Sequence, residues 1–187
     1  MLSALFVVSS MIAIYTGIAY TLYLDMVVPL FVCLIYMRLD LRHTLLSSIT
    51  SLLIVTFAIG DVASAIWMSQ GILMGLICGY FIRKKETIFD DLFYSAILGT
   101  FIMVLIDIYF SKLTGYSFMK EFDSYRDLFP LGSEYMTMAF NIFVAMMPMS
   151  TILIVYVGAL LIGKKLMILN ENCTEKYMII KNFKRYG

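Results

Sequence analysis

Long runs of apolar residues dominate this chain, and they restrict it to one class of fold. A membrane-spanning helix needs about 20 mostly apolar residues. Runs near that length lie at about 2–23, 42–60, 62–82, 92–111 and 136–163, and a shorter one covers 26–37. Only 14% of the 187 residues are charged, against roughly 25% in ordinary soluble domains. The sequence therefore predicts an all-α, polytopic membrane protein.

The positions of the basic residues predict how the chain crosses the membrane. Lys and Arg collect on the cytoplasmic side of membrane proteins. Of the 14 Lys and Arg residues, only Lys112, Lys120 and Arg126 lie in a loop that is rich in acids, and this loop is expected outside. We predict six transmembrane helices in the plasma membrane with both termini cytoplasmic. Residues 1–165 form the six-helix domain, and residues 166–187 form a basic cytoplasmic tail.

The run at 26–37 is the least certain of the six spans. As a helix it extends only about 18 Å at 1.5 Å per residue, and it contains Pro29. It forms either a short tilted span or a re-entrant segment. Six spans are preferred because they place Asp25 outside and Arg38 inside.

Two helices carry stripes of small residues with a four-residue spacing, which places each stripe on one helix face. Gly71, Gly75 and Gly79 form one stripe. Ser9, Ala13 and Gly17 form the other. Small residues let helix backbones approach closely in a membrane. The stripes therefore indicate either packing within this protein or docking of a partner subunit.

The layout around the glycine stripe resembles a known family. The glycine-spaced segment GILMGLICGYFIRKK follows a short PLFVCLIYMRLDLRH segment, and the last span ends in GKK. Over about residues 1–165 this layout is similar to the YybS-like (DUF2232) membrane proteins. These are grouped with the substrate-binding S-components of energy-coupling factor (ECF) transporters.

The resemblance implies a six-helix, S-component-like bundle that captures a vitamin-like solute from outside. Such a protein docks on a membrane scaffold (T) subunit that two ATPase subunits energise. In S-components with an AxxxA motif on the first helix, that motif contacts the scaffold. Here SxxxAxxxG stands in its place. MreD, a cell-shape scaffold protein, has a related six-span layout, and Gly60-Asp61 resembles its glycine–aspartate signature.

Polar residues inside the apolar runs are the candidate binding residues. Ionisable groups in a bilayer are costly and usually face a cavity or a partner. Asp107 lies within FIMVLIDIYF, Asn141 is expected at a similar depth, and Asp61 begins another span. Trp67 and Tyr109 lie in the same outer half. Polar groups that converge with aromatic rings are typical of a small-molecule pocket. Interfacial anchoring of Asp61 and Trp67, and helix–helix hydrogen bonds by Asp107 and Asn141, are the structural alternatives.

The remaining motifs argue against covalent chemistry. Two of the three cysteines, Cys33 and Cys78, lie inside apolar runs, and Cys173 is expected to be an exposed thiol in the tail. His43 is the only histidine, and MMPMS is read as apolar filler in preference to a copper site. No GxxxxGK[ST], GxSxG or HExxH motif occurs. We therefore predict no enzyme, cofactor or metal site, and any ATP hydrolysis belongs to another chain.

Two functions follow from the sequence. The first is a substrate-binding, S-component-like subunit of an ECF-type importer, with a small solute, the T subunit, two ATPase subunits and the lipid bilayer as partners. The second is a non-transport scaffold of cell-envelope assembly, similar to MreD. The net charge of +1 offers no basis for nucleic-acid binding.

Overall fold

The structure is a computed structural model that describes residues 2–16, 23–60, 62–84, 87–115, 133–169 and 171–186. All regular elements within these residues are helical. They are α1 (Leu2–Thr16), the π-helical turn η1 (Tyr23–Val27), α3 (Val28–Arg38), α4 (Leu41–Ile59), α5 (Val62–Arg83), α6 (Ile88–Thr114), α8 (Ser133–Lys165) and α9 (Glu171–Tyr186). The prediction of an all-α fold is confirmed for this part of the chain.

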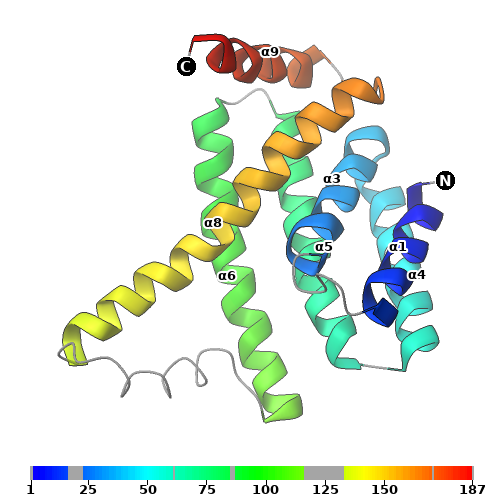
Figure 1. The fold of residues 1–187 in the computed structure, drawn as a ribbon, viewed down its shortest axis with the longest axis vertical. Coiled ribbons are helices and arrows are strands. Elements are labelled where there is room, and N and C mark those ends of the chain that lie inside the picture. Colours follow the sequence, from blue (N-terminus) through cyan, green and yellow to red (C-terminus); the bar gives the residue numbers. More distant parts are fainter. Residues whose placement is uncertain are drawn as a thin grey trace.

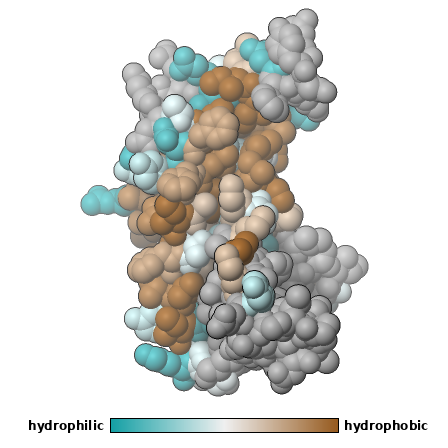
Figure 2. All heavy atoms as spheres, turned by 90° about the vertical axis from the view of Figure 1, so that its left-hand side faces the viewer, coloured by the Kyte–Doolittle hydropathy of each residue, from teal (hydrophilic) through white to brown (hydrophobic). Residues whose placement is uncertain are grey.

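Three of the described helices are long and apolar enough to cross a membrane. They contain the segments Leu41–Ala58, Ile88–Lys112 and Pro148–Lys165. Apolar residues also cover most of the height of the face seen in Figure 2. A soluble protein rarely exposes so large an apolar surface. These features fit a protein embedded in a membrane, and the full count of six spans stays a prediction.

Helix α3 lies at the centre of the bundle, between two apolar clusters. Val28, Val32 and Tyr36 on one face pack into a cluster with residues of α1, α4 and α5. Cys33 and Met37 on another face pack with residues of α5, α8 and α9. Protein therefore surrounds this short segment on several sides.

The glycine stripe on α5 lets α5 and α3 approach each other closely. A Cβ atom added at Gly75 would lie 2.8 Å from the Cβ of Val32 and would also meet the backbone of Pro29. A Cβ atom added at Gly79 would lie 2.8 Å from the ring of Tyr36. Gly75 and Gly79 therefore pack within this chain, which is the first of the two interpretations of the stripe.

Helix α6 has sequence signals at both of its ends. At its start, the backbone N–H of Asp90 donates to Thr87 Oγ1 (3.3 Å), and that hydroxyl donates to the Asp90 carboxylate (2.6 Å). At its end, Gly115 adopts a left-handed conformation with φ 74°, and its N–H donates to the carbonyl of Ser111. Glycine occupies such positions without the steric cost of a Cβ atom.

Helices α6 and α8 cross near their middles and then diverge (Figure 1). At the crossing, Gly99 of α6 lies against Ile152 of α8 and Met74 of α5. From there, the second half of α6 and the first half of α8 separate. At the other end of the molecule, α9 lies across the ends of the bundle. We call these the open end and the α9 end.

Candidate functional site

The α9 end brings together helix termini that carry basic side chains. Arg83, in the last turn of α5, donates from Nη1 to the carbonyls of Tyr36 (3.2 Å) and Leu39 (3.0 Å) at the end of α3. Its guanidinium also lies 5.4 Å from the ring centre of Tyr36. The last carbonyls of a helix lack partners within the helix and carry partial negative charge. Arg83 therefore caps α3.

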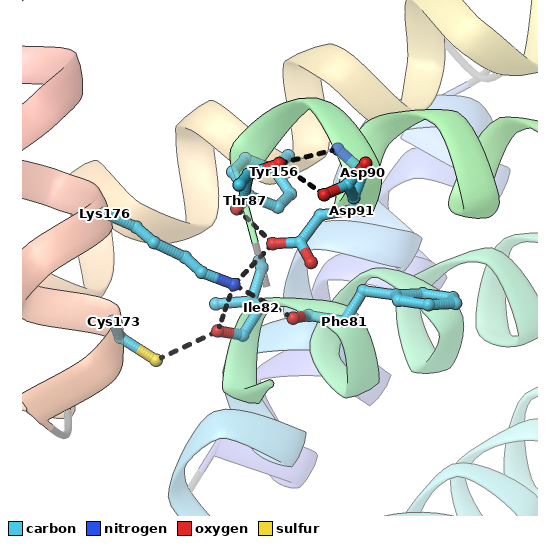
Figure 3. A network of polar contacts seen from close by, with 8 residues as sticks. All are labelled: Phe81, Ile82, Thr87, Asp90, Asp91, Tyr156, Cys173 and Lys176. Atoms are coloured by element: carbon cyan, nitrogen blue, oxygen red, sulfur yellow. Dashed lines mark hydrogen bonds and ion pairs between the residues drawn. The ribbon is translucent and has the colours of Figure 1, made fainter. Parts of the chain in front are cut away.

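A second cationic side chain caps α5 in the same way, but it comes from α9. The ammonium group of Lys176 donates to the carbonyls of Phe81 and Ile82, each at 3.2 Å. It also donates to Asp91 Oδ2 at 2.5 Å (Figure 3). The Lys176 side chain is buried, with 5% of its surface exposed. One ammonium group thus joins the end of α5 to the start of α6.

Asp91 is the carboxylate at this site, and its exposed fraction is 0%. It lies in the first turn of α6, where the positive end of the helix dipole favours a negative charge. The hydroxyl of Tyr156, on α8, donates to the same Oδ2 atom at 2.6 Å. We name the group formed by Lys176, Asp91, Tyr156 and the carbonyls of Phe81 and Ile82 the tail junction.

The tail junction holds four helices together through buried polar contacts. A buried charge is strongly destabilising unless it is paired and hydrogen-bonded. Here the ammonium has three oxygen acceptors, and Oδ2 of the carboxylate has two donors. Removing one partner of such a pair usually costs about 3–5 kcal/mol, because the other charge stays buried. The arrangement therefore positions helices.

Two of the predicted solute-binding residues, Asp107 and Tyr109, lie on the half of α6 toward the open end. Asp107 is on the second half of α6, inside the apolar segment Ile88–Lys112, and is partly buried. Tyr109 is 65% exposed, and the ammonium of Lys112 lies 6.0 Å from its ring centre. The two residues therefore share one helix segment but differ in burial.

The other predicted solute-binding residues are only partly described. Asp61 lies outside the described residues. Trp67 is on α5 and Asn141 is on the first half of α8, but their side chains are also outside the description. Helices α6 and α8 diverge toward this end (Figure 1). Asp107 and Asn141 therefore belong to helix halves that lie apart from each other.

The predicted partner-docking residues of the first helix lie partly inside the bundle. Ala13 is buried in the cluster around α3. Ser9 is partly buried, and Gly17 lies outside the described residues. On α5, Gly71 is buried along with Gly75 and Gly79. Docking of a partner through Ser9 and Ala13 stays a prediction. Ala13 already packs against other helices of this chain.

Comparison with known proteins identifies the family. Residues 4–127, about two thirds of the chain, match the DUF2232 family of predicted membrane proteins. The chain belongs to the DUF2232 family. No match was found among curated proteins or among solved structures. The family assignment therefore supports a membrane location and leaves the function to be argued from the structure.

The tail junction of this DUF2232 protein was not predicted from the sequence. Lys176 was expected to be one of many basic residues of a tail. One signal was available, because Cys173, Lys176 and Ile180 share a face of an amphipathic helix. A lysine in the middle of an apolar face needs an acceptor. The sequence does not indicate that this acceptor is Asp91, because 85 residues separate the two.

One expectation about this DUF2232 protein was wrong. Cys173 is not an exposed thiol, since 1% of its surface is exposed and its Sγ lies 3.7 Å from the carbonyl oxygen of Ile82. Cys33 and Cys78 are buried, as expected. His43 is exposed on α4. Within the described residues, no three His, Cys, Asp or Glu side chains gather as metal ligands.

Proposed function

We propose that this DUF2232 protein is a substrate-binding, S-component-like subunit of an ECF-type importer for a small, vitamin-like solute. It crosses the plasma membrane six times. Family membership, the all-helical fold and the apolar spans support the membrane part of this proposal. The resemblance to S-components supports the transport part. The scaffold (T) subunit and two ATPase subunits are supplied by other chains, since this chain has no phosphate-binding motif.

The position of the basic residues supports a cytoplasmic α9 end. The termini of α3, α5 and α8 that carry Arg38, Arg83, Lys164 and Lys165 belong to this end. Positive charge of this kind marks the cytoplasmic side. The open end then faces outside, where a solute enters.

Met167 offers a direct test of this orientation, because it is 93% exposed at the α9 end. The natural cysteines are buried. In a Met167→Cys variant, a membrane-impermeant thiol reagent should label inside-out vesicles and leave intact cells unlabelled. Labelling of intact cells would place the α9 end outside and reject the proposed topology.

The observation that carries the solute-binding proposal is the position of Asp107. Ionisable residues within an apolar span are costly, and they usually face a cavity or a partner. Asp107 lies on the half of α6 that diverges from α8. Tyr109 adds an exposed aromatic ring on the same segment. A solute with an N–H group or a cationic ring matches this combination.

The test is native mass spectrometry of the purified protein and its copurifying small molecules. Asp107→Asn keeps the shape of the side chain and removes the charge. Loss of a charged hydrogen bond should weaken solute binding by about 1.5–3 kcal/mol, roughly tenfold or more. Asp90→Asn is the matched control, since Asp90 is an exposed acid on α6 at the α9 end, and it should leave binding unchanged.

Two results would reject the proposal. Equal binding of the solute by the parent and by Asp107→Asn would make Asp107 structural. Copurification with envelope-assembly proteins and without any solute would favour the scaffold function.

A further inference from the structure

The connection between α8 and α9 is a tight reversal. The N–H of Ile168 donates to the carbonyl of Gly163 (2.9 Å), and the N–H of Met167 donates to the carbonyl of Lys164 (3.2 Å). This pair of bonds is a Schellman motif. Its left-handed position, usually a glycine, is Met167 with φ 55°. The motif ends α8 and turns the chain back over the bundle toward α9.

Helix α9 contacts the bundle along one face. Cys173 and Lys176 are buried there, and Ile180 packs against the core. Met178 is exposed on the opposite face, and Ile179 is exposed on a flank of the helix. A helix held along one face and connected at one end is suited to open as a unit, without unfolding of the rest.

The ammonium group of Lys176 dominates the polar contacts of that face. It fills a site built from the carbonyls of Phe81 and Ile82 and the Oδ2 atom of Asp91. None of these three acceptors belongs to α9. When α9 leaves, the ammonium and the Asp91 carboxylate both become accessible to water. The charge pair therefore holds the closed state, and water can solvate each of the two groups when α9 leaves.

We propose that α9 is a reversible latch over the end of the bundle, with its hinge at the Schellman motif and its closed position set by the ammonium group of Lys176. Opening moves α9 as one helix and uncovers the end of α5 and the start of α6. Closing returns Lys176 to the three oxygens and buries the thiol of Cys173. The latch does not depend on whether the protein transports a solute.

The unmodified protein tests the latch through its own cysteines. Cys173 is 1% exposed and Cys33 is 0% exposed, but only Cys173 is on α9. The rates of labelling by N-ethylmaleimide are measured for each cysteine by mass spectrometry and are normalised to the rates in denaturant. The latch predicts that Cys173 reacts at least about tenfold faster than Cys33, because opening of one element needs less energy than global unfolding. Equal normalised rates would mean that both thiols are exposed by the same global event, and would overturn the proposal.

Two lysine variants test the role of the ammonium group. Lys176→Met removes the charge from the buried site and should raise the Cys173 rate by on the order of a hundredfold. Lys181→Met is the matched control, since Lys181 is exposed on the same helix, and it should leave the rate at the parent value. An unchanged Cys173 rate in Lys176→Met would overturn the proposal.

The same variants distinguish a latch from a general loss of structure. In Lys176→Met, the closed state is destabilised, so the Cys33 rate should rise as well, but Cys173 should stay at least about tenfold faster than Cys33. Equal normalised rates of Cys173 and Cys33 in this variant would show that α9 does not open separately from the bundle, and would reject the latch. Adding Asp91→Asn to Lys176→Met removes the opposing charge and should bring the Cys173 rate back toward that of the parent. A double variant that labels as fast as Lys176→Met would contradict closure by this charge pair.

Discussion

The two halves of α6 place one aspartate each in very different surroundings. At the α9 end, Asp91 is fully buried and receives hydrogen bonds from Lys176 and Tyr156. Toward the open end, Asp107 is partly buried on a segment that diverges from α8. The two aspartates therefore differ in their surroundings on one helix. The buried Asp91 pair fixes helices to one another, and Asp107 is the acid that we propose to bind a solute.

The difference follows from what surrounds each residue. Lys176 of α9, Tyr156 of α8 and the end of α5 close around Asp91. The start of α6 and the end of α5 supply complementary partial charges. Asp107 lies beyond the crossing of α6 and α8, where the helices separate (Figure 1). Asp91 precedes the apolar run at 92–111 and Asp107 lies within it, yet Asp91 is the more buried of the two. The packing of neighbouring helices decides their burial.

The largest expected effect is that of Asp91→Ala. It leaves the ammonium of Lys176 buried without its carboxylate, so the free energy of unfolding should fall by about 3–5 kcal/mol. Denaturation of the protein in detergent, followed by circular dichroism, measures the change. Asp90→Ala is the control, since it loses only a helix-capping contact, and should cost about 1 kcal/mol. Equal losses in the two variants would remove the distinction between a paired, buried acid and its exposed neighbour.

Gly75→Ala should have an intermediate effect, and it tests whether the close packing of α3 and α5 extends beyond the α9 end. The added methyl group meets the backbone of Pro29, which cannot rotate away. We expect a loss of about 1–3 kcal/mol in the same denaturation experiment.

Gly99→Ala provides the matched comparison at the crossing of α6 and α8. There an added methyl group meets the flexible side-chain ends of Ile152 and Met74, so the cost should be smaller. A larger loss for Gly99→Ala than for Gly75→Ala would contradict this account of the packing.

Asp107→Asn should have the smallest effect on stability. Its side chain is partly accessible, and an amide is easier to bury than a carboxylate. Because the amide keeps an oxygen that can accept a hydrogen bond, we expect the free energy of unfolding to change by about 0.5 kcal/mol or less. A loss as large as that of Asp91→Ala would show that both ends of α6 use their acids structurally.

Much of the helical layout is predictable from the sequence, because long apolar runs in a membrane have few alternatives to helices. The runs at 42–60 and 62–82 agree closely with α4 and α5. The glycine stripe predicted close packing, and Gly75 and Gly79 pack closely against α3. The sequence did not predict that α3 lies at the centre, because the partner helices of each face depend on contacts between distant segments.

The tail junction could not be predicted for the same reason. The distribution of charge assigned Lys176 to the cytoplasmic tail and left Asp91 unremarked beside Asp90. Their pairing depends on the reversal at Met167, a residue type that does not signal a left-handed turn. Cys173 was expected to be exposed because the tail was treated as a separate segment, whereas α9 packs against the bundle.

The central claim is that the charge pair between Lys176 and Asp91 ties α9 to the bundle. A double-mutant cycle with Lys176→Met, Asp91→Asn and the combined variant measures this coupling through the free energies of unfolding. The account predicts that the combined variant is more stable than the sum of the two losses implies, by about 1–3 kcal/mol. Losses that add to within about 0.5 kcal/mol would show that the two groups act independently, and would contradict the claim.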